Sequence, residues 1–234
     1  MHLVVIIPAY NEARTVGDVV RRVREHIPDV IVVDDGSSDA TGERARAAGA
    51  EVVRHCVNRG LGAALRTGIA AALRQDPSSR GDAEGSRPPE QADILVTLDA
   101  DGQHDPTEIG ALTAPIAEGV ADVVIGVRSF AGAPRHRRLF NQIGNVVTWL
   151  LFGVWCSDTQ SGFRAFSRRA AAQITIRTNR MEVSSEIIAE VSRHNLRIAE
   201  VPIRTIYTPY SMAKGQSFRT GVKTAWALLL RKWL

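Results

Sequence analysis

Short runs of apolar, mostly β-branched residues recur along this sequence and constrain its fold more than any other feature. A strand with one face in water alternates in polarity, whereas a continuous apolar run is typical of a strand covered on both faces. The runs that we assign to strands span residues 3–7, 30–33, 51–54, 94–98 and 122–126. Because parallel sheets are buried on both faces, these runs predict a mostly parallel sheet.

Helical periodicity separates the predicted strands. Four valines after the first strand share one helical face, and residues 60–73 form an alanine-rich helical segment. The four valines are Val16, Val19, Val20 and Val23. Strands that alternate with helices at this spacing predict an α/β fold with a doubly wound, mostly parallel sheet.

Three polar side chains directly follow predicted strands. Tyr10 follows the first strand, Asp35 the second, and Asp99 the run at residues 94–98. In a doubly wound sheet, ligands bind beyond the carboxyl ends of the strands. We therefore expect these three side chains to project into one crevice.

The chain is long enough for one domain with a substantial core, since it has 234 residues of which 44% are hydrophobic. We predict one domain over residues 1–217, followed by a C-terminal amphipathic helix at residues 218–234. Residues 75–91 change abruptly to Pro, Ser, Gly and charged residues, which indicates a mobile insertion. The two cysteines lie far apart, as expected for thiols in a reducing compartment.

The net charge of +4 favours an anionic partner, which could be nucleic acid, a phosphorylated substrate or an acidic membrane surface. The basic residues are not interleaved with stacking aromatic residues, so nucleic acid is the least favoured of these. We find no signal-peptide pattern and no apolar run as long as a membrane span. We therefore expect a cytoplasmic protein that binds the cytoplasmic membrane face peripherally.

Residues 99–105 read Asp-Ala-Asp-Gly-Gln-His-Asp and form the densest acidic cluster after a predicted strand. Carboxylates this close repel one another, and a hard divalent cation such as Mg²⁺ or Mn²⁺ would offset that repulsion while bridging phosphates. The alternative is a solvated acidic loop that caps the next helix, a role that suits Asp105 before Pro106. For Asp99 and Asp101 we expect metal and nucleotide binding.

The segment at residues 34–41 reads Asp-Asp-Gly-Ser-Ser-Asp-Ala-Thr and allows two interpretations. By itself it fits an ordinary turn with a capping serine or aspartate. Because it follows a strand, Asp35 is also placed to bind the base or ribose of a nucleotide.

Four of these segments together resemble the motif series of family 2 inverting glycosyltransferases, in order and in spacing. They are residues 8–12 (Pro-Ala-Tyr-Asn-Glu), 33–39, 58–60 and 99–103. Residues 158–166 further resemble the branch that contains dolichol-phosphate mannose synthase and other polyprenyl-phosphate glycosyltransferases. The resemblance implies a GT-A-type fold with a nucleotide-binding half and an acceptor half.

The resemblance also implies roles for single residues. The positions that would bind the sugar donor are Pro8, Tyr10, Glu12, Asp35, Asp99, Ala100 and Arg128. Asp101 and Gln103 would be the metal ligands. For Arg128 the alternative is an ordinary surface arginine.

On the acceptor side, Arg135, Arg137 and Arg138 precede the apolar segment at residues 143–156. Arginine forks suit phosphate oxygens, so these arginines, with Ser161, predict a site for a phosphate whose tail is hydrocarbon. A solvated charge run and a buried core helix are the alternatives. Glu186 is a candidate acid lining the acceptor site, or else an exposed helix glutamate.

The C-terminal segment has aromatic and apolar residues on one helical face and basic residues largely elsewhere. The apolar face comprises Val222, Trp226, Leu229, Leu230 and Trp233. This pattern is typical of a helix at a membrane interface, and also of a helix packed on its own domain or a second subunit.

We therefore predict metal-dependent, inverting transfer of a sugar from GDP-mannose or a UDP-sugar to a polyprenyl phosphate. The residues expected to act in catalysis are Asp99, Asp101, Arg128 and Glu186. A saccharide hydroxyl acceptor is the first alternative and would need a base. A nucleotidyltransferase should carry a glycine-rich basic loop at residues 8–12, and a non-catalytic binding module would not need the acidic cluster.

Overall fold

A computed structural model describes residues 1–74, 92–128, 142, 145, 146, 149, 153, 155–180 and 182–206. Several predictions lie outside these residues. They concern the insertion at residues 75–91, Arg135, Arg137, Arg138 and the C-terminal helix at residues 218–234.

One seven-stranded sheet runs through the molecule in the order β3-β2-β1-β4-β6-β5-β7. The strands are β1 (Leu3–Ala9), β2 (Val30–Asp34), β3 (Glu51–Arg54), β4 (Ile94–Thr97), β5 (Val123–Arg128), β6 (Arg164–Ser167) and β7 (Ile198–Ile203). Neighbouring strands pair in parallel except β6, which is antiparallel to both β4 and β5. The mostly parallel α/β sheet predicted from the apolar runs is confirmed.

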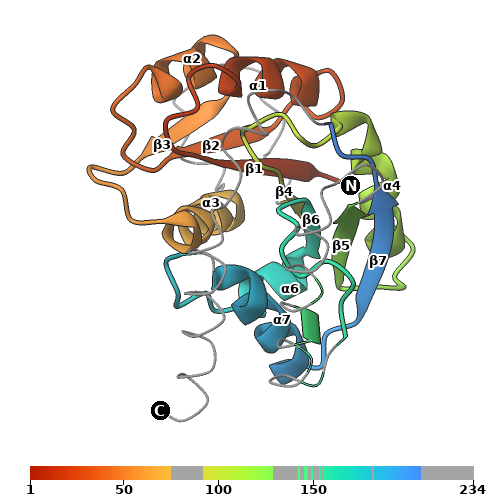
Figure 1. The fold of residues 1–234 in the computed structure, drawn as a ribbon. Coiled ribbons are helices and arrows are strands. Elements are labelled where there is room, and N and C mark those ends of the chain that lie inside the picture. The colour runs from red at the N-terminus through yellow and green to blue at the C-terminus, as the bar shows by residue number, and fades with distance from the viewer. Residues whose placement is uncertain are drawn as a thin grey trace.

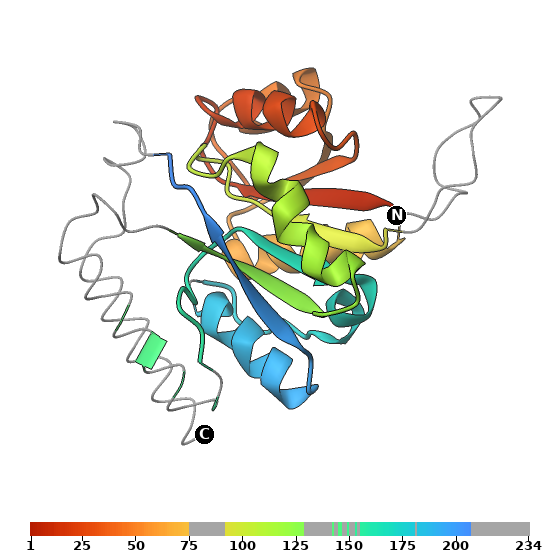
Figure 2. The ribbon, with the colours of Figure 1, turned by 90° about the vertical axis from the view of Figure 1, so that its right-hand side faces the viewer.

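Helices cover both faces of the sheet (Figure 1). They are α1 (Val16–Arg24), α2 (Thr41–Ala47), α3 (Leu61–Arg74), the 3₁₀ helix η2 (Pro106–Glu108), α4 (Ile109–Ala117), α6 (Arg168–Gln173) and α7 (Val183–Arg193). Figure 1 shows α1 and α2 on one side of β1 and β2, with α3 on the other. Figure 2 shows α4 and α7 on opposite sides of β5 and β7.

Alternate residues of the strands supply the two halves of the core, because successive side chains of a strand point to opposite faces. Val5 and Ile7 of β1 pack with the buried valines of α1. Val4 and Ile6 pack with α3 residues such as Leu65. The valine face predicted for α1 is therefore confirmed, and it is the face that seals one side of the sheet.

Strands β6 and β7 did not stand out as strands in the sequence. β6 contains the charged Arg164, although that side chain is only 2% exposed, and β7 is a partly exposed edge strand interrupted by a glutamate and a proline. Because β6 is antiparallel, its first residue Arg164 pairs with Thr97 at the carboxyl end of β4. The charged side chain of Arg164 therefore lies at the end of the sheet where the predicted site residues are found.

No helix in the described part of the chain is both long enough and apolar enough to span a bilayer.

Candidate active site

Asp99 lies two residues beyond the end of β4, and two other parts of the chain approach its side chain. The buried His104 ring approaches it, with Nε2 3.0 Å from Asp99 Oδ2. On another side lies the loop at residues 158–163, where a Cβ atom on Gly162 would overlap both Asp99 carboxylate oxygens. The hydroxyl of Thr97 fixes that loop by donating to the Gly162 carbonyl at 2.8 Å. A hydrogen bond with His104 thus positions Asp99, and the absence of a side chain at Gly162 leaves the space that the Asp99 carboxylate occupies.

The surroundings of Asp99 favour its ionised form. Burial alone would raise its pKa, but the hydrogen bond with His104 and the charges of His104, Arg128 and Arg164 lower the pKa below its ordinary value. Arg164 is itself buried, and its Nε has no hydrogen-bond partner among the residues described. Two guanidinium groups therefore lie close enough to this carboxylate to act on it.

The neighbouring Asp101 shows the opposite effect. Burial and the negative charge of Asp99 raise the pKa of Asp101, and the charge of Glu12 raises it further. One oxygen of Asp101 accepts a hydrogen bond from the Gln103 backbone N–H at 3.0 Å, which closes a tight turn. Asp101 therefore feels the negative charge of both Asp99 and Glu12, and a cation bound beside it would offset that repulsion.

The donor set suits a hard divalent cation that shares its ligands with a substrate. No group of three or more Asp, Glu, His or Cys residues in the described ranges could hold a metal by itself. Mg²⁺, however, is usually bound by one or two carboxylates together with waters and substrate phosphates. Burial and the charges of Asp99 and Glu12 raise the pKa of Asp101, and a cation bound beside that carboxylate would favour its ionised form. The predicted second ligand, Gln103, is fixed through its backbone, which donates to Asp101 and accepts from Ile206.

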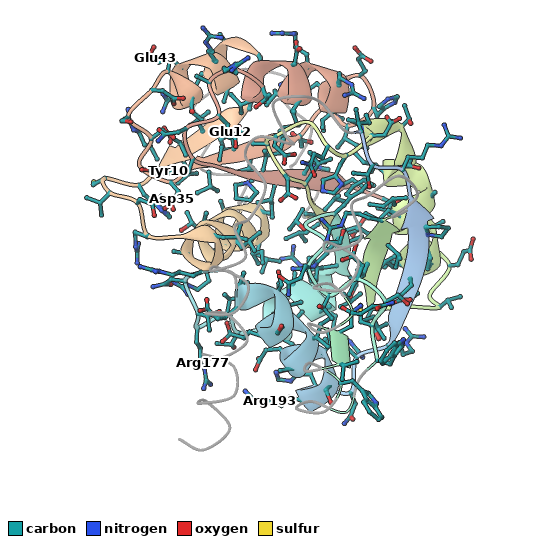
Figure 3. The ribbon with its side chains drawn as sticks, in the orientation of Figure 1. Tyr10, Glu12, Asp35, Glu43, Arg177 and Arg193 are labelled. Atoms are coloured by element: carbon teal, nitrogen blue, oxygen red, sulfur yellow. The ribbon has the colours of Figure 1, made fainter. Side chains whose placement is uncertain are left out.

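Asp35 lies at the carboxyl end of β2, as predicted, and is almost completely buried. Figure 3 shows it at the same end of the sheet as Tyr10 and Glu12. Its carboxylate accepts hydrogen bonds from the ring of His55 and from the backbone N–H groups of Arg59 and Gly60. Its neighbour Asp34 does serve the turn, since it accepts from the Ser37 N–H, so the two adjacent acids have different tasks.

Arg128, the last residue of β5, is clamped by Asp158. Its Nε and one terminal nitrogen donate to the two carboxylate oxygens of Asp158 at 2.7 and 2.8 Å. Asp158 is fully buried, and its turn is held in place by Asn145, which donates to the Ser157 carbonyl and accepts from Thr159. Arg128 is therefore no freely moving surface arginine.

The remaining predicted residues differ in how they could contact a ligand. The Tyr10 side chain is 45% exposed, whereas the Ala100 side chain belongs to the core, so a contact with the sugar donor would come from its backbone. Ser161 is fully buried, and its hydroxyl accepts from the Phe163 N–H. Both Glu186 oxygens accept from the loop before α7, through the backbone of Arg177 and Thr178. Through these contacts Ser161 and Glu186 stabilise the conformation of the loops beside them.

The predicted capping role of Asp105 is confirmed, because its side chain accepts from the Thr107 N–H at the start of η2. Sequence reasoning missed the partners of the site residues. These are His55, Asn145, Asp158, Gly162 and Arg164. Gly162, Asp158 and Arg164 lie in the segment that carried the family resemblance, and this was the available signal for them.

Comparison with known proteins settles the family. Residues 4–175 match the sequence profile of glycosyl transferase family 2. The chain belongs to this family. It is 34% identical to the UDP-N-acetylglucosamine–dolichyl-phosphate N-acetylglucosaminyltransferase of Methanococcus voltae, over 97% of this chain and 94% of that protein. It is 31% identical to the undecaprenyl-phosphate mannosyltransferase of Micrococcus luteus, over 87% and 83% of the two chains.

Among solved structures, the chain resembles glucosyl-3-phosphoglycerate synthase from Mycobacterium tuberculosis in complex with Mn²⁺, UDP-glucose and phosphoglyceric acid. The TM-score is 0.73 at 21% identity, over 99% of this chain and 79% of that one. This likeness shows a GT-A fold, and the family shows a glycosyltransferase. The family resemblance, the fold class and the enzyme class predicted from the sequence are confirmed.

Proposed function

We propose that this family 2 enzyme transfers a sugar from a nucleotide-sugar donor to a polyprenyl phosphate, with a divalent cation and with inversion at the anomeric carbon. The observation that carries the proposal is the pairing of opposite charges at one end of the sheet. Asp99 and Asp101 suit a cation bound to the diphosphate of the sugar donor. Arg128 and Arg164 supply positive charge to the same place. The two relatives named above act on dolichyl and undecaprenyl phosphate according to their names, which supports this acceptor.

The chemistry is a single displacement. An acceptor phosphate oxygen attacks the anomeric carbon, and the bond from that carbon to the donor's phosphate oxygen breaks, so that the nucleoside diphosphate leaves. A bound Mg²⁺ or Mn²⁺ would supply charge stabilisation for the leaving diphosphate. Asp101 would hold that ion, with Gln103 as the second proposed ligand. Pro8, Tyr10, Glu12 and Asp35 would position the nucleotide.

The acceptor phosphate is already anionic near neutral pH, so this reaction needs positioning more than a strong base. The alternative acceptor, a saccharide hydroxyl, would need a base, and Glu186 is the candidate. Both Glu186 oxygens already accept backbone hydrogen bonds from residues 177 and 178, which favours the lipid phosphate. Arg135, Arg137, Arg138 and Ser161 remain the proposed contacts of the acceptor phosphate.

Contact with a membrane surface would bring the enzyme to such an acceptor. Trp149 and Trp155 pack edge to face with ring centroids 6.3 Å apart, yet their side chains are 46% and 56% exposed. Exposed tryptophans are typical of membrane interfaces, which supports peripheral attachment through this segment.

The proposal is tested by incubating the purified protein with UDP-sugars or GDP-mannose, Mg²⁺ or Mn²⁺, and polyprenyl phosphate. We expect a glycolipid that extracts into organic solvent, with the anomeric configuration opposite to that of the sugar donor. Polyprenol without its phosphate is the matched control and should give no product. Transfer to a saccharide with none to polyprenyl phosphate would contradict the proposed acceptor.

Replacing Arg128 by lysine should lower the transfer rate by about 10- to 100-fold. Lysine keeps the positive charge but cannot make the two parallel hydrogen bonds to Asp158, and a charged hydrogen bond contributes about 1.5–3 kcal/mol. The measurement is the steady-state rate at saturating substrates. The control is Arg21→Lys, since Arg21 forms an exposed ion pair with Asp18 on α1. An Arg128→Lys rate equal to that of the control would show that the paired hydrogen bonds between Arg128 and Asp158 have no role in transfer.

A further inference from the structure

Residues 175–179, which we call the linker, lie in the connection between α6 and α7, and their backbone N–H groups bond to α7. The Glu186 carboxylate accepts from the N–H groups of Arg177 at 2.9 Å and Thr178 at 2.8 Å, and also from the Thr178 hydroxyl. One turn further along α7, Glu190 accepts from the first N–H of the linker at 3.0 Å. Two carboxylates of one helix therefore hold the linker.

The carbonyl groups of the linker bond to α3 instead. Arg66 of α3 donates to the Ile176 carbonyl at 3.0 Å and to the side-chain oxygen of Asn179 at 2.8 Å. The Gly62 N–H, in the first turn of α3, donates to the Asn179 carbonyl at 3.0 Å. Because the linker donates hydrogen bonds to α7 and accepts them from α3, it ties the two helices together.

The linker packs directly against the start of α3. A Cβ atom at Gly60 would overlap the Asn179 carbonyl oxygen, and a Cβ atom at Gly62 would overlap the Thr178 carbonyl oxygen. The backbone of the linker therefore occupies the space that a side chain at either position would need. If the linker moved, the first turn of α3 would have to move with it or lose this contact.

Gly60 also contacts the loop after β2. Its N–H donates to Asp35 Oδ2 at 2.7 Å, while the Arg59 N–H donates to Asp35 Oδ1 at 3.0 Å. The φ angle of Gly60 is 92°, in the left-handed region that favours glycine, and this conformation lets the chain turn from that contact into α3. A continuous series of contacts therefore runs from Glu186 through the linker and Gly60 to Asp35.

We propose that Glu186 is a positioning residue for the donor side of the enzyme, and that it acts through the linker and Gly60 without touching a substrate. In the proposed function, on which this inference rests, Tyr10, Glu12 and Asp35 position the nucleotide. Loss of Glu186 would release the linker and so disturb the loop that holds Asp35. Such a change weakens nucleotide binding and leaves kcat nearly unaltered, whereas loss of an acid that acts on the acceptor lowers kcat.

The test measures binding of UDP and of GDP to the whole chain by calorimetry with Mg²⁺, together with steady-state transfer. In Glu186→Ala, the nucleotide that the unaltered protein binds should bind about 10-fold more weakly, the effect of one lost hydrogen bond to a charged group. At saturating sugar donor, kcat should stay within about 2-fold. Glu186→Gln keeps one accepting oxygen and should recover most of the affinity. The matched control, Glu182→Ala, removes the same charge one turn earlier in α7 and should change neither quantity.

A second variant releases the linker from the side of α3. Arg66→Met removes both hydrogen bonds of Arg66 to the linker but keeps an apolar side chain, and should weaken nucleotide binding by a similar factor. No hydrogen bond or ion pair of the described residues joins Arg66 to Glu186, so the two changes can influence each other only through the linker. Combined, they should still weaken binding only about 10-fold, because either change alone already releases the linker.

The outcomes separate this inference from the proposed function. Effects that multiply in the double variant, or an unchanged nucleotide affinity in Glu186→Ala, would overturn the role of Glu186. A loss confined to kcat and equal in the Ala and Gln variants would make Glu186 an acid at the acceptor, and would overturn it too. In each of these cases transfer by the unaltered protein would leave the proposed function standing. If the unaltered protein bound neither nucleotide and transferred no sugar, both would fail. If Glu186→Ala does not fold, the affinity and kcat of Arg66→Met decide.

Discussion

Replacing Asp101 by asparagine is expected to lower sugar transfer by at least about 100-fold, which corresponds to about 2.7 kcal/mol of transition-state stabilisation. Asparagine can still accept the hydrogen bond from the Gln103 N–H that closes the turn, so the local fold should survive. What it lacks is the negative charge that would hold a divalent cation beside Asp99. The measurement is the transfer rate across a titration of Mn²⁺, together with Mn²⁺ binding in the presence of UDP.

The matched control for this variant is Asp18→Asn, which removes one carboxylate from an exposed position on α1. The control should keep the rate and the metal dependence of the unaltered protein, with the same melting temperature. Full activity of the Asp101 variant in metal-depleted buffer would show that Asp101 is no metal ligand. It would leave the family assignment untouched.

The second large effect is expected from a single methyl group. Gly162→Ala places a Cβ where both oxygens of Asp99 now lie, so either the carboxylate or the loop at residues 158–163 must move. Because a displacement of about 1 Å in a catalytic group can lower a rate 100-fold, we expect a loss of at least that size. Steady-state kinetics should show the loss in kcat, since the displaced group acts on the reaction.

Gly110→Ala is the matched control, because a Cβ at Gly110 in α4 would meet no atom within 4 Å. Alanine is the better helix former, so this variant should be as stable as the unaltered protein or up to about 1 kcal/mol more stable. Thermal unfolding of both variants separates loss of folding from loss of the Asp99 position. A Gly162→Ala enzyme with an unchanged kcat would mean that Asp99 tolerates displacement.

The sheet was largely predictable because its central strands are covered on both faces and so must be apolar throughout. β1, β2 and β4 are such strands, and their runs were assigned correctly. β6 was not predicted because it contains a buried arginine, Arg164, whose charge is offset by Asp99 and Asp158 elsewhere in the chain. β7 was not predicted because it is an edge strand that the rest of the protein covers only in part, so its apolar pattern is weak.

The site was predictable where its chemistry is local. Asp99 and Asp101 stand together after a buried strand, so the convergence of carboxylates could be inferred from spacing. The pairing of Arg128 with Asp158 spans 30 residues, and that of His55 with Asp35 spans 20. Such contacts arise from how the loops fold back, and no local pattern encodes them. The sequence therefore indicated which residues carry charge at the site, while the structure shows what fixes each of them.

The clamp between Arg128 and Asp158 has a consequence for how this enzyme can diverge. Asp158 is wholly buried, so loss of Arg128 alone would remove the hydrogen-bond partner of both its carboxylate oxygens, and breaking a buried ion pair is typically destabilising by about 3–5 kcal/mol. We therefore expect a change at either position alone to lower the stability of the fold unless the other position changes with it. Positions 128 and 158 should therefore change together in descendants of this chain, while neighbouring loop residues vary independently.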